Sequence, residues 1–169
     1  KAMNVDDAAV FNDYVNKVEA AANISVSSYG DYLKALKSRH DYFDANGAKV
    51  SDHGLEQIYA EDYTDIEIET IFGKIRKGAT LSLVENHKFK SAMLIEFAKW
   101  DHERGWVQQY HLGALRNNNA RMLSLLGPDT GWDSIGDFSQ SRAMAKFFNK
   151  LDSTDQLAKT ILYNLNPAD

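Results

Sequence analysis

Cysteine is absent from the 169 residues, which excludes disulfide bonds and cysteine-ligated zinc sites. The chain has only 2 prolines and 10 glycines, a content that argues against long flexible linkers. No apolar run approaches the roughly 20 residues needed to span a bilayer, and no signal peptide is visible. The formal net charge is -5 without a basic cluster, which argues against a nucleic-acid-binding surface. We therefore expect a soluble, cytoplasmic protein that binds neither membranes nor nucleic acid.

The composition of the chain is typical of a globular protein. Hydrophobic residues make up 44% of the chain and charged residues 25%, and the length is sufficient for one domain with its own core. The sequence begins without methionine and ends just after the strand-like run "TILYNLNPAD". On these two observations we expect the chain to be an excerpt of a longer protein.

Helical patterns dominate the first 105 residues. Amphipathic spacing and glycine stops predict long helices there, two of them near 64–77 and 82–104. Each of these two begins with a capping box, in which a hydroxyl and a glutamate three residues later satisfy each other's backbone N–H groups. The predicted capping boxes are the pairs Thr64/Glu67 and Ser82/Glu85.

Three short stretches are typical of strands, at 48–52, 106–114 and 159–165. Short helices are expected between the last two, near 118–126 and 140–150. A strand, a helical crossover and a further strand form a βαβ unit, whose strands are parallel. The sequence therefore predicts a helix-rich α/β fold with about three parallel strands.

The same elements divide the chain into four predicted segments. A helical segment over 1–47 leads into a strand end at 48–53, and a helical insertion or connection spans 54–105. The last segment, 106–169, is a βαβ unit that carries a polar loop.

Polar residues gather where the predicted strands end, which is where α/β proteins with parallel strands bind ligands. Asp52 ends the first strand and His111 ends the second. An imidazole is the natural proton carrier near neutral pH, so His111 is a candidate catalytic group with Asp52 beside it. Each has a structural alternative: Asp52 could cap a helix beginning near Gly54, and a lone histidine is more often a satisfied core residue.

Arg116 follows His111 by five residues, in the loop after the strand. Its guanidinium matches a carboxylate in shape and charge, which suits a site for an acidic sugar. The alternative is a surface ion pair with an acid such as Asp129 or Asp133.

The remaining polar features receive structural interpretations. The three asparagines at 117–119 are expected to cap the next helix, and one of Gln108 and Gln109 is expected to face a polar barrel interior. The loop "GPDTGWDSIGDF" is interpreted as a surface loop, with a lid as the alternative. Three further histidines are assigned to the surface, namely His40, His87 and His102. No HxH pair, HExxH helix, GxGxxG, P-loop or GxSxG motif is found.

Several stretches of the sequence resemble a known family. The stretch "RGWVQQYHLGALRNNNARMLSLLGPDTGWDSIGDF" closely resembles the signature region of uronate isomerases, also called glucuronate isomerases. The stretches "KAMNVDDAAVFNDYV", "GAKVSDHGL" and "TILYNLNPAD" resemble the same family, in the same order and at similar spacing. The resemblance covers essentially the whole chain.

The resemblance implies a partial (β/α)8 TIM barrel of the amidohydrolase-like type with a helical insertion. It also implies interconversion of D-glucuronate with D-fructuronate and of D-galacturonate with D-tagaturonate. The family usually holds a divalent metal, often zinc, on an HxH pair at the end of the first strand and an aspartate at the end of the last. We expect those ligands to lie outside this chain, which is therefore expected to be inactive alone.

Residue by residue, the resemblance implies that Asp52 and His111 match active-site residues and that Arg116 matches a substrate-binding arginine. The alternative is a non-catalytic relative that keeps the barrel core but lacks the metal-site segments. A different amidohydrolase-like activity is a third reading. A partial barrel leaves open sheet edges, so we also expect homo-oligomers or association through those edges.

Overall fold

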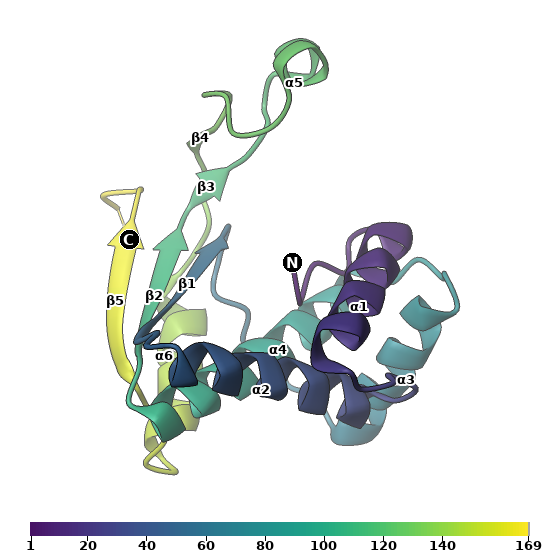
Figure 1. Ribbon diagram of the computed structural model, residues 1–169. Coiled ribbons are helices and arrows are strands. Elements are labelled where there is room, and N and C mark those ends of the chain that lie inside the picture. The colour runs from purple at the N-terminus through teal and green to yellow at the C-terminus, as the bar shows by residue number, and fades with distance from the viewer. Residues whose placement is uncertain (169) are drawn as a thin grey trace.

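The computed structural model describes residues 1–168, and in it the helices of the first half stand beside a small parallel sheet (Figure 1). Asp169, the last residue of the predicted segment 106–169, lies outside the described residues. The helices are α1 (Ala8–Ala22), α2 (Tyr29–Ala45), α3 (Asp65–Arg76), α4 (Leu83–Arg104), α5 (Ala120–Leu126) and α6 (Ser141–Asp152). The strands are β1 (Val50–Leu55), β2 (Val107–Leu112), β3 (Ala114–Leu115), β4 (Ser134–Ile135) and β5 (Lys159–Asn164).

The two predicted capping boxes are confirmed. The Glu67 N–H donates to Thr64 Oγ1 at 3.3 Å, and the Thr64 N–H donates back to the Glu67 carboxylate at 2.8 Å. Ser82 and Glu85 repeat this exchange at the start of α4, at 3.3 and 2.9 Å. An N-cap of this kind contributes about 0.5–2 kcal/mol to helix stability. These bonds explain why α3 and α4 begin where the sequence indicated.

The main sheet has the order β1-β2-β5, with both neighbouring pairs parallel. This confirms the helix-rich α/β prediction and its three parallel strands. The limits of the first strand differ from the prediction, because β1 continues past position 53 to Leu55. Gly54 and Leu55 pair with His111 and Leu112 of β2. The structural alternative for Asp52, a cap on a helix beginning near Gly54, is therefore wrong, because Asp52 lies inside a strand.

One face of this sheet is covered by α4 and α6. Tyr110 and Leu112 of β2 are fully buried, and they cluster with Leu55 of β1 and with Phe147 and Leu151 of α6. Figure 1 shows α6 behind the strands. Because side chains alternate along a strand, the strand residues that alternate with the buried ones point to the opposite face of the sheet. No helix among residues 1–168 covers that opposite face, which we call the open face; it carries Asp52, Gly54, Gln109, His111 and Tyr163.

The two glutamines of β2 point to different faces. Gln108 is fully buried on the covered face, where its Oε1 accepts from the Tyr110 hydroxyl at 2.8 Å and its Nε2 donates to Thr160 Oγ1 at 2.7 Å. These bonds satisfy a polar side chain that would otherwise be costly to bury. Gln109 lies on the open face. If one of the two glutamines faces a polar barrel interior, as the sequence predicts, it is Gln109.

A second cluster of buried residues lies among α1, α2, α3 and α4, away from the sheet. At its centre the ring of Phe11 meets Tyr32, Phe72 and Phe89 edge-on, at centroid distances of 5.6, 6.3 and 5.8 Å. Such edge-to-face pairs add specific geometry to the burial of apolar area. Helix α4 contributes to this cluster and also to the one beneath the sheet.

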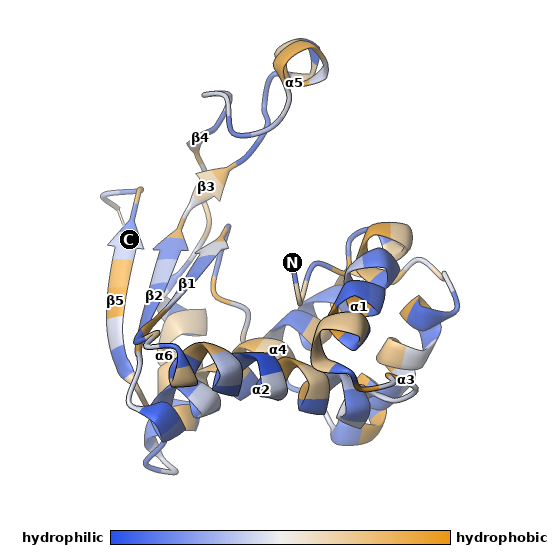
Figure 2. Ribbon diagram, viewed as in Figure 1, coloured by the Kyte–Doolittle hydropathy of each residue, from blue (hydrophilic) through white to orange (hydrophobic). Residues whose placement is uncertain are grey.

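An arm made of β3, α5 and β4 projects beyond the carboxyl ends of the main strands (Figure 1). The expected cap is confirmed, since Asn119 Oδ1 accepts the Met122 N–H at 3.0 Å at the start of α5. Helix α5 has no buried residue, and Leu125 is 69% exposed. Figure 2 shows much of α5 in the colour of hydrophobic residues. The predicted surface loop forms part of this arm, and β4 pairs antiparallel with β3.

None of the helices in residues 1–168 combines the length and the apolar content that crossing a bilayer requires.

Within residues 1–168, β1 and β5 each have one edge without a neighbouring strand. Apolar side chains lie exposed on both strands, for example Val50 at 48% and Ile161 at 41%. Association of copies through these edges stays a prediction, as does the division of the chain into four segments.

Candidate active site on the open face

Four polar side chains from three neighbouring strands meet on the open face. Asp52 comes from β1, Gln109 and His111 from β2, and Tyr163 from β5. The register places Asp52 beside Gln109, and it places His111 between Gly54 and Tyr163. Gly54 has no side chain, and on that side His111 contacts Asp52. The sheet register thus brings together residues that are about fifty positions apart in the sequence.

Asp52 and His111 form a direct pair, with 2.9 Å between Oδ1 of Asp52 and Nε2 of His111. A carboxylate attracts a proton on the nitrogen that faces it, so Asp52 favours the form of His111 that has its proton on Nε2. In the neutral imidazole the other nitrogen, Nδ1, then has a lone pair and acts as an acceptor. No residue among 1–168 donates to Nδ1, so this atom remains available to a substrate hydroxyl.

Tyr163 and Gln109 support the pair and were missed by sequence reasoning. The Tyr163 ring is stacked on the His111 ring, with centroids 4.5 Å apart and planes 15° from parallel. The Tyr163 hydroxyl donates to Gln109 Oε1 at 2.9 Å. Alternation along β5 could have placed Tyr163 on one face, but nothing in the sequence indicates that β5 lies next to His111.

Arg116 lies in the arm, just after β3. Its Nη1 is 3.0 Å from Asp133 Oδ2 and 3.8 Å from Asp129 Oδ1, so the ion pairs that were the structural alternative are present. Asp133 also accepts the Asn117 N–H at 2.9 Å, which anchors it to the backbone next to Arg116. The Arg116 side chain is still 47% exposed. Asp133 therefore orients a guanidinium that keeps donors free for a ligand.

Arg116 also reaches the main sheet. A Cβ atom placed at Gly54 would lie 3.2 Å from Nη2 of Arg116. Gly54 pairs with His111 in the register, so the guanidinium lies over β1 beside the candidate proton carrier. The structure thus brings Asp52, His111 and Arg116 to one end of the open face.

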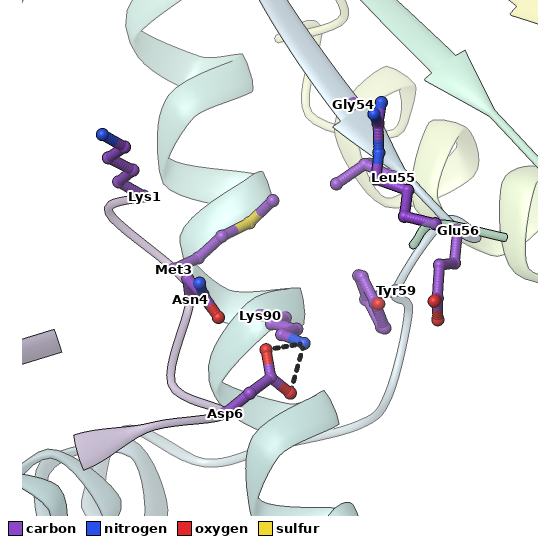
Figure 3. Close-up of a pocket in the computed structure, with 10 residues that line it drawn as sticks. Lys1, Met3, Asn4, Asp6, Gly54, Leu55, Glu56, Tyr59 and Lys90 are labelled. Atoms are coloured by element: carbon purple, nitrogen blue, oxygen red, sulfur yellow. Dashed lines mark hydrogen bonds and ion pairs between the residues drawn. The ribbon is translucent and has the colours of Figure 1, made fainter. Parts of the chain in front are cut away.

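A pocket of about 400 Å³ opens next to Gly54 and Arg116. The end of β1 and the segment after it form one wall, and the other wall comes from the N-terminal residues and α4 (Figure 3). In the second wall, Lys90 Nζ contacts both carboxylate oxygens of Asp6, at 3.1 and 3.0 Å. Lys90 is paired in this way, which leaves Lys1 and Arg116 as the other cations that line the pocket and could meet an anionic ligand.

Gly54→Ala is expected to raise the KM of a full-length protein that carries these residues for a carboxylate substrate about two- to tenfold, the usual effect of weakening one hydrogen bond. The added methyl group would displace the Arg116 guanidinium by a few tenths of an ångström, while Gly54 has no left-handed backbone that alanine would strain. Steady-state kinetics measures the effect. The control is Gly73→Ala, where the new Cβ meets no atom within 4 Å. Equal KM values in both variants would show that ligand binding by Arg116 does not depend on the absence of a side chain at Gly54.

The other histidines lie away from this site. His53 points to the covered face, between the rings of Phe97 and Tyr110, and burial lowers its pKa below the usual value. His40 is not a surface residue as predicted, because its side chain is only 12% exposed. Its Nε2 lies 3.0 Å from a buried oxygen of Asp101, and its ring is stacked on Trp106.

A metal ion needs at least three suitable side chains close together. Among residues 1–168 no group of three or more histidine, cysteine, aspartate or glutamate side chains has this arrangement. Asp52 and His111 are a pair that is already bonded internally. The described residues therefore do not fit a metal centre on their own, and we derive no chemical step through a metal.

The chain is similar to known proteins over its whole length. The family model described as "Glucuronate isomerase" matches residues 1–169. The chain is 55% identical over 169 residues to a uronate isomerase from Cellvibrio japonicus, and 54% identical over 167 residues to one from Phocaeicola vulgatus. It covers 100% and 99% of its own length in these matches but 36% of each relative, so it spans about a third of their length.

Solved structures give the same result. The crystal structure of uronate isomerase from Thermotoga maritima matches with a TM-score of 0.91 at 30% identity, over 99% of this chain and 36% of that one. That of glucuronate isomerase from Caulobacter crescentus matches with a TM-score of 0.83 at 29% identity, over 96% and 34%. With a family match over its whole length and the fold of two solved members, the chain belongs to the glucuronate isomerase family.

Proposed function

We propose that the open face of this chain supplies part of the active site of a uronate isomerase. The reaction interconverts D-glucuronate with D-fructuronate and D-galacturonate with D-tagaturonate. One observation carries the proposal: the 2.9 Å pair of Asp52 and His111 lies at the end of the sheet where Arg116 approaches Gly54. A proton carrier beside an exposed guanidinium is what an open-chain sugar acid requires.

The chemistry moves hydrogen between two carbons of the substrate. In the aldose-to-ketose direction the C2 proton is removed, an enediol forms, and a proton is added at C1 while the hydroxyl proton on O2 leaves and O1 gains one. Atoms and electrons balance without an oxidant. Such a reaction needs a base at C2, a group that moves protons at the two oxygens, and an anchor for charge.

Each named residue has one role in this scheme. His111 exchanges a proton with the reacting oxygens through Nδ1, the nitrogen that has no partner among residues 1–168. Asp52 orients His111 through the contact of its carboxylate with Nε2, and Arg116 binds the negative charge of the substrate. The base that takes the C2 proton is not assigned to a residue of this chain. The divalent metal that the family resemblance implies supplies Lewis-acid chemistry when bound, and its ligands are likewise not assigned here.

The test uses an enzyme of full length that carries these 169 residues. One such protein is the Cellvibrio japonicus enzyme with its matching segment replaced by this chain, and the unmodified enzyme is the control. Turnover of D-glucuronate or D-galacturonate by the folded chimera supports the proposal. A folded chimera without turnover, beside an active parent, would instead show a non-catalytic relative that keeps the barrel core.

A further inference from the structure

The ring of Tyr163 lies against the candidate proton carrier but takes no part in the proton transfers proposed for His111. We propose that Tyr163 is a positioning residue that, together with Gln109, holds the His111 imidazole in one plane while Nδ1 stays free. The inference rests on the proposed function of His111. It does not place Tyr163 in contact with the reacting atoms.

The pair of Asp52 and His111 does not fix the imidazole by itself. The His111 side chain is 48% exposed and that of Asp52 is 60% exposed, so solvent screens their attraction. A single contact at Nε2 also leaves the imidazole free to tilt, and the outer torsion of histidine is broad. A second contact, on the face of the ring, is needed to define its plane.

Tyr163 provides that contact. Its ring is nearly parallel to the imidazole, 15° apart, at a centroid distance of 4.5 Å, which is the geometry of an offset stack. The residues are direct partners in the register of β2 and β5, so the sheet hydrogen bonds fix the distance between their backbones. The edge of the imidazole is bound by Asp52 and its face by Tyr163, and these contacts together set its orientation.

Tyr163 is itself held by a bond from the same strand that carries His111. Its hydroxyl donates to Gln109 Oε1 at 2.9 Å, and Gln109 is two residues before His111 on β2. This bond matters because the Tyr163 residue is 44% exposed and would otherwise change rotamer freely. The phenol ring is therefore tied to β2 at its hydroxyl end and to β5 at its backbone.

The experiment compares three variants in the full-length chimera described above. Tyr163→Leu removes the ring, and Tyr163→Phe keeps the ring but removes the bond to Gln109. The control is Tyr42→Leu on α2, which removes a tyrosine that is 51% exposed and contacts Phe43 and Arg39. For each we measure kcat, KM and the 15N signals of the His111 ring, which distinguish the protonated nitrogen from the free one.

Tyr163→Leu is expected to lower kcat roughly 10- to 100-fold, as misplacement of a reacting group does, with KM changed less than about twofold. Tyr163→Phe is expected to lose about two- to tenfold in kcat, and Tyr42→Leu to match the wild type. In the wild type the His111 signals show a proton on Nε2 alone, whereas Tyr163→Leu shows a mixture of both forms.

The inference is overturned if Tyr163→Leu and Tyr42→Leu have the same kcat, or if Tyr163→Leu changes KM and leaves kcat intact. A chimera without any turnover would remove the proposed function. In that case the nitrogen signals decide the positioning role by themselves, and identical signals in the wild type and Tyr163→Leu would refute it.

Discussion

His111→Ala in the full-length enzyme is expected to lower kcat by about 10²–10⁴, the usual contribution of a general acid or base. The imidazole is the group on the open face whose Nε2 faces the Asp52 carboxylate at 2.9 Å and whose Nδ1 has no hydrogen-bond partner among residues 1–168. Alanine removes both nitrogens. Arg116 stays in place, since it is held by Asp133 and not by His111, so KM is expected to change much less than kcat.

The control for this variant is His102→Ala in the last turn of α4, a partly exposed histidine of the helical half. Its kcat is expected to equal that of the wild type within experimental error. Initial rates with D-glucuronate and D-galacturonate measure both variants. If His111→Ala retained turnover within a few-fold of the wild type, the role given to His111 would be wrong.

Phe11→Ala is expected to reduce the free energy of unfolding by about 3–5 kcal/mol, the usual cost of truncating a buried phenylalanine. Phe11 is 0% exposed and meets the rings of Tyr32, Phe72 and Phe89 edge-on. The deletion removes three aromatic contacts and leaves a cavity that helices anchored by their caps cannot fill. Urea denaturation followed by far-UV circular dichroism measures the loss.

The matched control is Phe43→Ala on α2, because Phe43 is 52% exposed and lies outside both buried clusters. Its expected cost is below about 1 kcal/mol, as for most exposed positions. A similar loss in both variants would mean that the aromatic cluster is not the stabilising centre of the helical half. Neither phenylalanine lies on the open face, so both tests probe stability apart from chemistry.

Local signals accounted for most elements of the fold. The capping boxes at Thr64 and Ser82 and the alternating pattern of β2 act over a few residues, so the sequence predicted them directly. The end of β1 was not predictable in this way. Gly54 is part of a strand only because His111 pairs with it from a segment more than fifty residues later.

The candidate site was only partly predictable, because some of its contacts depend on pairing between strands that are distant in the sequence. Asp52, His111 and Arg116 were identified from residue type, strand ends and family resemblance, and the structure brings them to one end of the sheet. Tyr163 was missed, because its contact with His111 depends on the order of the strands. The burial of His40 was missed too, since Asp101 and Trp106 reach it from α4 and from the start of β2.

Helix α4 is the element shared by the two buried clusters. Phe89 and Met93 belong to the helical cluster, whereas Leu94 and Ile95 belong to the cluster beneath the sheet. Most surface helices have one outward side on which substitutions accumulate freely, but much of the circumference of α4 is internal. Any substitution that enlarges one of its buried side chains must therefore be matched by compensating changes in either the helical half or the sheet.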